Sequence, residues 1–191
     1  MYITSQNYYT SSLFNDCPLE TLYLGRNIDY INIDYPTYSY SPFYNQNKLT
    51  SITISNNVTS IESGMFSGCS NLKSINIPNS ITTIDDNAFD NCTKLKKLHI
   101  EDGETTLSLS RSRYVSSGNG NPGHHNGLFY DCPLDTLYLG RNIQYEVGIS
   151  NIGDEIRAPF SYNKTLKSVT IGNNVTTIGY EAFYQCLNLT M

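Results

Sequence analysis

The sequence predicts a β-rich solenoid, in which short parallel strands stack coil upon coil, with a short helical or 3-10 turn in each coil and one inserted β-hairpin. Two residue types carry this prediction. The seven phenylalanines all occupy one position of a repeated block, namely Phe14, Phe43, Phe66, Phe89, Phe129, Phe160 and Phe183. The five cysteines each follow such a phenylalanine by three residues, at Cys17, Cys69, Cys92, Cys132 and Cys186.

The complete block reads L-x-x-I-x-I-P-x-x-I-T-x-I-x-x-x-A-F-x-x-C-x-x-L at 72–95 and recurs with small changes at 49–72 and 166–189. Its first part alternates apolar and polar residues, which predicts a strand with leucine and isoleucine pointing inward. A shorter strand follows at I-T-x-I, and a one-turn helix then presents phenylalanine and cysteine to the interior. One coil cannot bury its apolar face alone, but coils stacked about 4.8 Å apart can.

The chain begins with a polar, tyrosine-rich stretch at 1–12, which predicts a short edge strand or an irregular lead-in. Residues 13–28 form the first coil. Within it, alternation along the strand 19–24 turns Thr21 and Tyr23 outward.

Residues 29–42 are irregular, and Pro36 and Pro42 keep this segment out of a central strand ladder because proline has no donor to contribute. Five tyrosines gather in and beside it: Tyr30, Tyr35, Tyr38, Tyr40 and Tyr44. This tyrosine cluster is either a second candidate binding surface or a lid over the edge of the coils.

Residues 43–95 contain the regular coils. We expect long strands at 49–54, 72–77 and 95–100, and short second strands near 58–61 and 81–84.

Residues 98–109 break the period. Alternating apolar residues flank Asp102-Gly103, a combination that predicts a β-hairpin. The stretch that follows, through 127, is rich in glycine and asparagine and predicts an exposed loop.

A longer duplication overlies the short one, because 128–189 repeats 13–72 with a longer insert at 144–159. Over 13–28 and 128–143 the copies differ only at Asn15/Tyr130 and Glu20/Asp135. Stacked coils share one continuous core, so we expect 1–191 to form a single domain.

Composition excludes some partners. The net charge of -5 argues against nucleic acid, since binding to phosphate needs clusters of lysine and arginine. No apolar run approaches the roughly 20 residues of a membrane span, and the start lacks the features of a signal peptide. Neither end shows a polar capping repeat, so we expect a piece of a longer protein and end-to-end self-association through the uncapped coils.

The block pattern, with its F-x-x-C turn and L-x-x-I-x-I strand, resembles the BspA-type leucine-rich repeat. The resemblance covers 49–95 and 166–189 nearly position for position, and 13–24 and 128–139 in part; the inserts depart from it. It implies a secreted or surface-anchored bacterial protein, with relatives in parasitic protozoa. It also implies adhesion to host matrix proteins or to other cells.

No motif predicts catalysis, and the sequence predicts neither a cofactor nor a metal. Nucleophile elbows, phosphate loops and zinc-protease motifs are all missing. The pair His124-His125 lies in the expected loop without spaced ligands. The cysteines sit at inward repeat positions, so we interpret them as buried, reduced thiols that act as small apolar groups.

The remaining candidate is the exposed strand face, where outward positions of successive strands form a shallow ladder. Its candidate binding residues are Thr21, Tyr23, Thr53, Asn76, His99, Thr136, Tyr138 and Thr170. Tyrosine offers a large contact area at a low cost in entropy, which favours protein binding at this face. A carbohydrate-binding region, or a spacer with a solvated face and no partner, are the alternatives from other classes.

Overall fold

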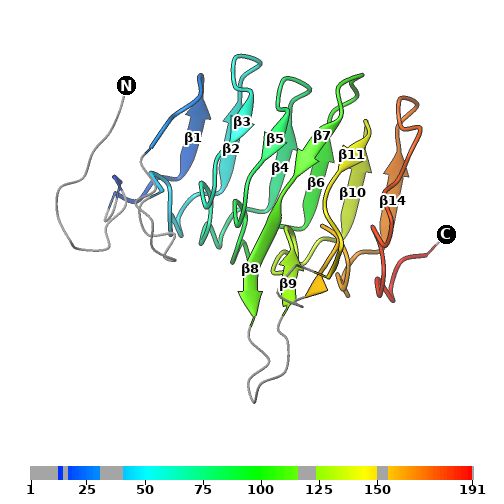
Figure 1. Cartoon of the computed structure of the whole chain (residues 1–191). Coiled ribbons are helices and arrows are strands. Elements are labelled where there is room, and N and C mark those ends of the chain that lie inside the picture. Colours follow the sequence, from blue (N-terminus) through cyan, green and yellow to red (C-terminus); the bar gives the residue numbers. More distant parts are fainter. Residues whose placement is uncertain (1–12, 15–16, 31–40, 116–123, 150–154, 191) are drawn as a thin grey trace.

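The computed structural model describes residues 13–14, 17–30, 41–115, 124–149 and 155–190. Short strands stand side by side in a row that follows the chain from its N-terminal to its C-terminal end (Figure 1). Every described coil adds a strand beside the one before it. The predicted set of short parallel strands is therefore confirmed.

The first row holds the long strand of each coil. Its members are β1 Thr21–Leu24, β2 Ser51–Ile54, β4 Ser74–Ile77, β6 Lys97–Ile100, β10 Thr136–Leu139 and β14 Ser168–Ile171. β1 pairs with β2, and β4, β6, β10 and β14 form one parallel sheet in that order. Equivalent residues of the L-x-x-I-x-I pattern are paired, so isoleucines and leucines stack in register inside and polar residues stack outside.

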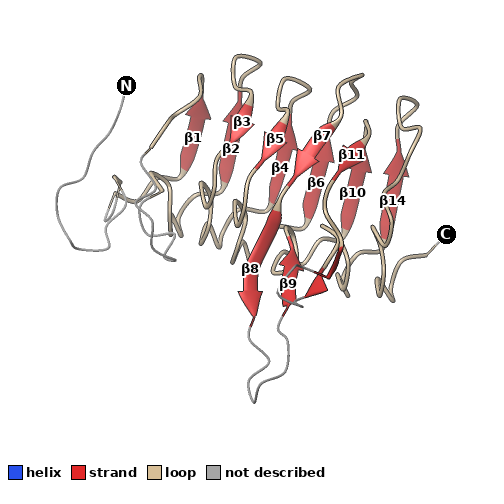
Figure 2. Ribbon diagram, in the orientation of Figure 1, coloured by secondary structure: helices blue, strands red, loops and turns tan. Residues whose placement is uncertain are grey.

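A second row holds the short strands. They are β3 Ser60–Ile61, β5 Thr83–Ile84, β7 Leu107–Leu109 and β11 Ile143–Gln144, paired in parallel in that order. The two rows enclose the apolar core between them (Figure 2).

A separate four-stranded sheet projects from one side of the two rows (Figure 1). It consists of β8 Arg111–Val115, β9 His124–Gly127, β12 Gly148–Ile149 and β13 Glu155–Ile156. β8 and β9 are antiparallel. β13, which lies in the insert at 144–159, pairs parallel to β9.

The position predicted for the hairpin is wrong. β6 and β7, which flank Asp102-Gly103, belong to different sheets and do not pair with each other. Neighbouring coils offer each of these strands a parallel partner, and that tertiary pairing overrides the local turn signal. The antiparallel hairpin is instead β8 and β9, inside the stretch predicted as a loop, and His124-His125 therefore lies on a strand.

The phenylalanines form a continuous stack through the core. Successive rings, from Phe14 to Phe183, have centroids between 5.4 and 5.9 Å apart. Offset stacking at such distances is a favourable geometry for aromatic rings. The two end members are partly buried and the five between them are buried.

Turns occupy the segments in which a short helix was expected, and the described residues contain no helix. Each turn is closed by bonds of the type Cys69 N to Phe66 O, at 3.1 Å. The residue two after the phenylalanine has a left-handed backbone in five coils: Asn45, Gly68, Asn91, Tyr162 and Gln185. A left-handed residue cannot continue a right-handed helix, so the chain turns away at that point.

Four of the five cysteines are buried free thiols, as predicted, whereas Cys17 is exposed, contrary to the prediction. Each buried thiol contacts the carbonyl of a phenylalanine one coil earlier, as Cys92 Sγ does at 3.3 Å from Phe66 O. Gln46, which replaces cysteine in its coil, donates to Phe14 O at 2.7 Å and so preserves the contact.

Candidate functional site

The outward positions of the long strands form the exposed strand face. Of the predicted residues, seven are exposed and Tyr138 is half-buried. Register places four of them in one line across the four-stranded sheet: Asn76, His99, Tyr138 and Thr170. Thr136 lies on the same sheet, whereas Thr21, Tyr23 and Thr53 lie on β1 and β2, whose ladder is interrupted before β4.

His99 and Tyr138 are stacked on each other at the centre of this line. Their ring centroids are 4.4 Å apart and the rings are inclined by only 9°. The Tyr138 hydroxyl donates to Asp102, with its oxygen 2.8 and 2.9 Å from the two carboxylate oxygens. That hydrogen bond, together with the negative charge of Asp102, raises the pKa of Tyr138 above its usual value.

Asp102 belongs to an enlarged corner, residues 101–106, which connects β6 to β7. Six residues separate Ile100 from Leu107, whereas three separate their paired residues, Leu139 and Ile143, in the following coil. The extra length lets this corner extend over the ends of the neighbouring strands.

Glycines make room for the enlarged corner on one side. A Cβ added to Gly140 would lie 2.4 Å from the backbone nitrogen of Asp102, and one added to Gly172 would lie 2.5 Å from its Oδ1. On the other side, Glu101 accepts hydrogen bonds from Asn76 Nδ2 at 2.6 Å and from the Asn79 backbone at 3.2 Å.

Arg141 belongs to the corner that follows β10 and reaches back to the corner that follows β4. Its side chain is fully buried, and its guanidinium donates to the carbonyls of Pro78 and Asn79, both at 2.9 Å. Burial lowers the pKa of Arg141, and the charge of Glu101 opposes that shift. The ion therefore ties the corner that follows β10 to the corner that follows β4, two coils earlier.

Sequence reasoning found His99 and Tyr138 but missed Glu101, Asp102 and Arg141 as parts of the site. The available signal was the greater length of the 101–106 corner, which was interpreted as a hairpin turn.

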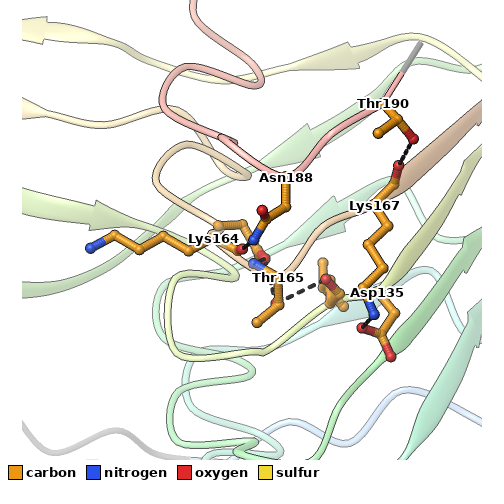
Figure 3. A network of polar contacts seen from close by, with 8 residues as sticks. Asp135, Lys164, Thr165, Lys167, Asn188 and Thr190 are labelled. Atoms are coloured by element: carbon orange, nitrogen blue, oxygen red, sulfur yellow. Dashed lines mark hydrogen bonds and ion pairs between the residues drawn. The ribbon is translucent and has the colours of Figure 1, made fainter.

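The coil that carries β14 is tied to the β10 coil by a network of polar contacts (Figure 3). Lys167 Nζ lies 3.4 Å from Asp135 Oδ1, and Thr165 Oγ1 donates to the Leu134 carbonyl at 2.9 Å. Thr190 Oγ1 donates to the Lys167 carbonyl at 3.3 Å. The backbone pairing of β14 with β10 places Thr170 beside Tyr138.

A shallow hollow of about 480 Å³ lies on the exposed strand face. Its lining includes Asn76, Lys97, His99, Tyr138, Ser168 and Thr170. A second hollow, of about 620 Å³, lies beside the short strands and is lined by serines and by Asp85, Asp86, Tyr145 and Glu146.

The tyrosine cluster is described only in part, because Tyr35, Tyr38 and Tyr40 lie outside the described residues, as does the lead-in at 1–12. Tyr30 is half-buried, and its hydroxyl donates to the Ser63 carbonyl. Burial of this phenol raises the pKa of Tyr30 well above its usual value. It therefore acts as a contact between coils.

Within the described ranges, no three histidine, cysteine, aspartate or glutamate side chains gather as metal ligands. No helix long and apolar enough to cross a membrane occurs in the same ranges.

Comparison with known proteins gives a family and no individual relative. The family model described as BspA type leucine rich repeat region matches residues 37–145 and 124–191, in six copies. No curated protein and no solved structure gives a significant match to the chain. The family match spans most of the chain and coincides with the stacked Phe–Cys coils of the structure, and the chain belongs to the BspA-type leucine-rich repeat family.

Proposed function

We propose that residues 1–191 form one leucine-rich-repeat solenoid that acts as a non-catalytic protein-interaction module of a secreted or cell-surface protein. Its role is adhesion, through the exposed strand face, to a host matrix protein or to a protein of a neighbouring cell. Membership of the family supports an interaction or surface role in general terms. The choice of face rests on the geometry of the strands.

The observation that carries this proposal is the fixed position of Tyr138. Stacking on His99 and bonding to Asp102 restrict both torsions of an accessible aromatic side chain. A side chain that is already ordered loses little entropy when a partner binds. Threonines and serines line the hollow beside the ring pair and leave it accessible to a protein surface.

Replacing Tyr23 and Tyr138 together by alanine tests the proposal. We expect the double variant to lose most of its adherence to immobilised matrix proteins and to cells, because large aromatic contacts commonly dominate binding energy. Tyr184→Ala, which removes an exposed tyrosine outside the strand face, is the matched control. Unchanged adherence of the double variant would exclude this face.

Carbohydrate binding is a second candidate, because an accessible tyrosine that lines a hollow is hydrogen-bonded to a carboxylate. Sugars pack against the face of an aromatic ring, and one face of Tyr138 is covered by His99. This arrangement favours a protein partner. A glycan array distinguishes a carbohydrate partner from a protein partner. Carbohydrate binding requires that the wild-type chain bind a glycan on the array and that Tyr138→Ala abolish this binding.

A further inference from the structure

We propose that a row of lysines along one edge of the long strands binds a sulfated polysaccharide. We call this row the lysine edge, and it consists of Lys48, Lys73, Lys94, Lys96 and Lys97. It is a second interaction surface beside the exposed strand face, and the inference goes beyond the proposed function.

The first support is the placement of positive charge. All seven lysines of the chain lie four to eight residues after a phenylalanine of the stack, where the turn enters a long strand. Five of them fall on the three successive coils that contain β2, β4 and β6, and these coils have no carboxylate in the same stretch. A chain with a net charge of -5 therefore carries a local cluster of positive charge.

The second support is that stacking of the coils brings these charges together. The Lys96 backbone nitrogen donates to the Lys73 carbonyl at 2.9 Å, so the two lysines are neighbours on adjacent coils. Lys94 Nζ donates to Asn71 Oδ1, on the coil that lies between Lys94 and Lys48. Because coils stack about 4.8 Å apart, the lysine edge spans roughly 10 Å from its first coil to its third.

The third support is that these charges are available to a ligand. All five side chains are exposed, and within the described ranges no carboxylate forms an ion pair with them. Lys167, by contrast, lies 3.4 Å from Asp135. Asp135 and Glu20 belong to the coils on either side, so negative charge bounds the lysine edge at both ends.

The surroundings favour a polysaccharide over a protein. Lys97 lines the hollow of about 480 Å³ together with Ser74, Thr136 and Ser168, whose hydroxyls are suitable partners for sugar hydroxyls. None of the large apolar side chains that are exposed in the described ranges lies on the lysine edge. Protein interfaces depend on such side chains for most of their binding energy.

The shape of the lysine edge also favours a flexible polyanion. Lysine ammonium groups act as point charges on flexible stems, so they neutralise sulfate groups without demanding one geometry. A flexible polysaccharide can cross the three coils and leave the surface before it meets Glu20 or Asp135. A DNA duplex is stiff over this length and would lie across the flanking carboxylates.

Calorimetric titration of the whole chain with a heparin hexasaccharide tests the inference. We expect saturable binding in about 0.05 M NaCl that weakens at least about tenfold in about 0.3 M NaCl, because salt screens exposed charges. A desulfated hexasaccharide of the same length should bind at least about tenfold more weakly than the sulfated one. Absence of saturable binding at the lower salt concentration, or equal binding of the two sugars, would overturn the inference.

Two double variants with the same change in net charge locate the site. Lys96→Gln/Lys97→Gln removes two charges of the lysine edge and should weaken hexasaccharide binding at least about threefold. Lys164→Gln/Lys167→Gln removes two exposed lysines outside it and should stay within about twofold of wild type. Circular dichroism checks that both variants fold like wild type. Equal losses in the two variants would show that net charge determines binding, and would reject the lysine edge.

Competition separates a polysaccharide from other anionic partners. A DNA duplex of about 12 base pairs and a hexaglutamate peptide should displace the hexasaccharide only at concentrations at least about tenfold higher than the sulfated sugar requires. Displacement by either competitor at an equal concentration would reject a polysaccharide as the occupant. Adherence to matrix proteins is measured separately, so its loss or retention in the tyrosine double variant leaves this result unaffected.

Discussion

Residues 13–28 and 128–143 have nearly the same sequence, and they make the same contacts with the coil that follows them. Asn27 and Asn142 each accept a hydrogen bond at 2.8 Å from the backbone of a threonine in the next coil. The hydroxyls of Tyr30 and Tyr145, just beyond the two segments, each donate to a backbone carbonyl of that coil.

On the opposite side the two segments differ. The described coil that contains β6 and β7 lies against 128–143, and none of the described coils lies on the equivalent side of 13–28. Leu128 is 1% exposed and Arg141 is fully buried, whereas Leu13 is 50% exposed and Arg26 is exposed. Tyr138 is stacked and hydrogen-bonded, whereas Tyr23 is 69% exposed. Similar sequences therefore give similar contacts only where both partners are repeated.

The largest effect is expected from the phenylalanine stack. Phe129→Ala should cost about 3–5 kcal/mol of unfolding free energy, because it leaves a cavity between two stacked rings. Phe14→Ala should cost less than half as much, since Phe14 is partly exposed and has one described ring neighbour. Urea unfolding followed by circular dichroism measures both. Equal losses would contradict the comparison.

Replacement of the two equivalent arginines should give the next largest difference in unfolding free energy. Arg141→Met should cost about 2–3 kcal/mol, because it removes two charge-assisted hydrogen bonds and leaves the buried Pro78 carbonyl without this donor. Arg26→Met, at the equivalent exposed position, should stay within about 0.5 kcal/mol of wild type. The same unfolding experiment compares the two, and a neutral Arg141→Met would show that this contact with the corner after β4 does not stabilise the fold.

Cysteine substitutions in the two copies should differ less in unfolding free energy than the arginine substitutions. Cys132→Ser places a hydroxyl at a buried site and should cost about 1–2 kcal/mol, whereas Cys17→Ser should have almost no effect. Labelling of native protein with a thiol reagent adds an independent measurement. Cys17 should react rapidly, and Cys132 should react only as fast as the core opens. Rapid labelling of Cys132 in the native state would argue against the buried cysteine ladder.

The hydroxyl contact that Tyr30 and Tyr145 share should contribute least to the unfolding free energy at neutral pH. Its contribution should become measurable in alkali. Burial raises the pKa of Tyr145 to about 12 and that of Tyr30 further, whereas an unfolded tyrosine titrates near about 10. The stability that these phenols contribute is present below pH about 10 and is lost as the pH rises through their native values, because the unfolded chain loses its protons first.

In both Tyr30→Phe and Tyr145→Phe, the unfolding free energy should therefore decrease less steeply with pH above about 10. Chemical unfolding at a series of pH values measures the slope. A slope that changes in one variant only would show that the two copies do not use this contact alike.

The strand rows and the phenylalanine stack were predictable from sequence because the repeated block imposes the same alternation on every coil. The hairpin was not, since an Asp-Gly turn competes with parallel partners that only the folded neighbours supply. The turns that replaced the expected helices depend on left-handed residues such as Tyr162, whose type does not favour that backbone.

The sequence by itself determined which residues point inward and which point outward, because side-chain direction alternates along a strand whatever lies beyond it. It also determined the spacing of the coils and the residues that line the strand face. Only the tertiary structure decided that Tyr138, and not Tyr23, is held beside a carboxylate. That carboxylate comes from the enlarged corner of a neighbouring coil, and the two tyrosines have the same local sequence but different neighbours.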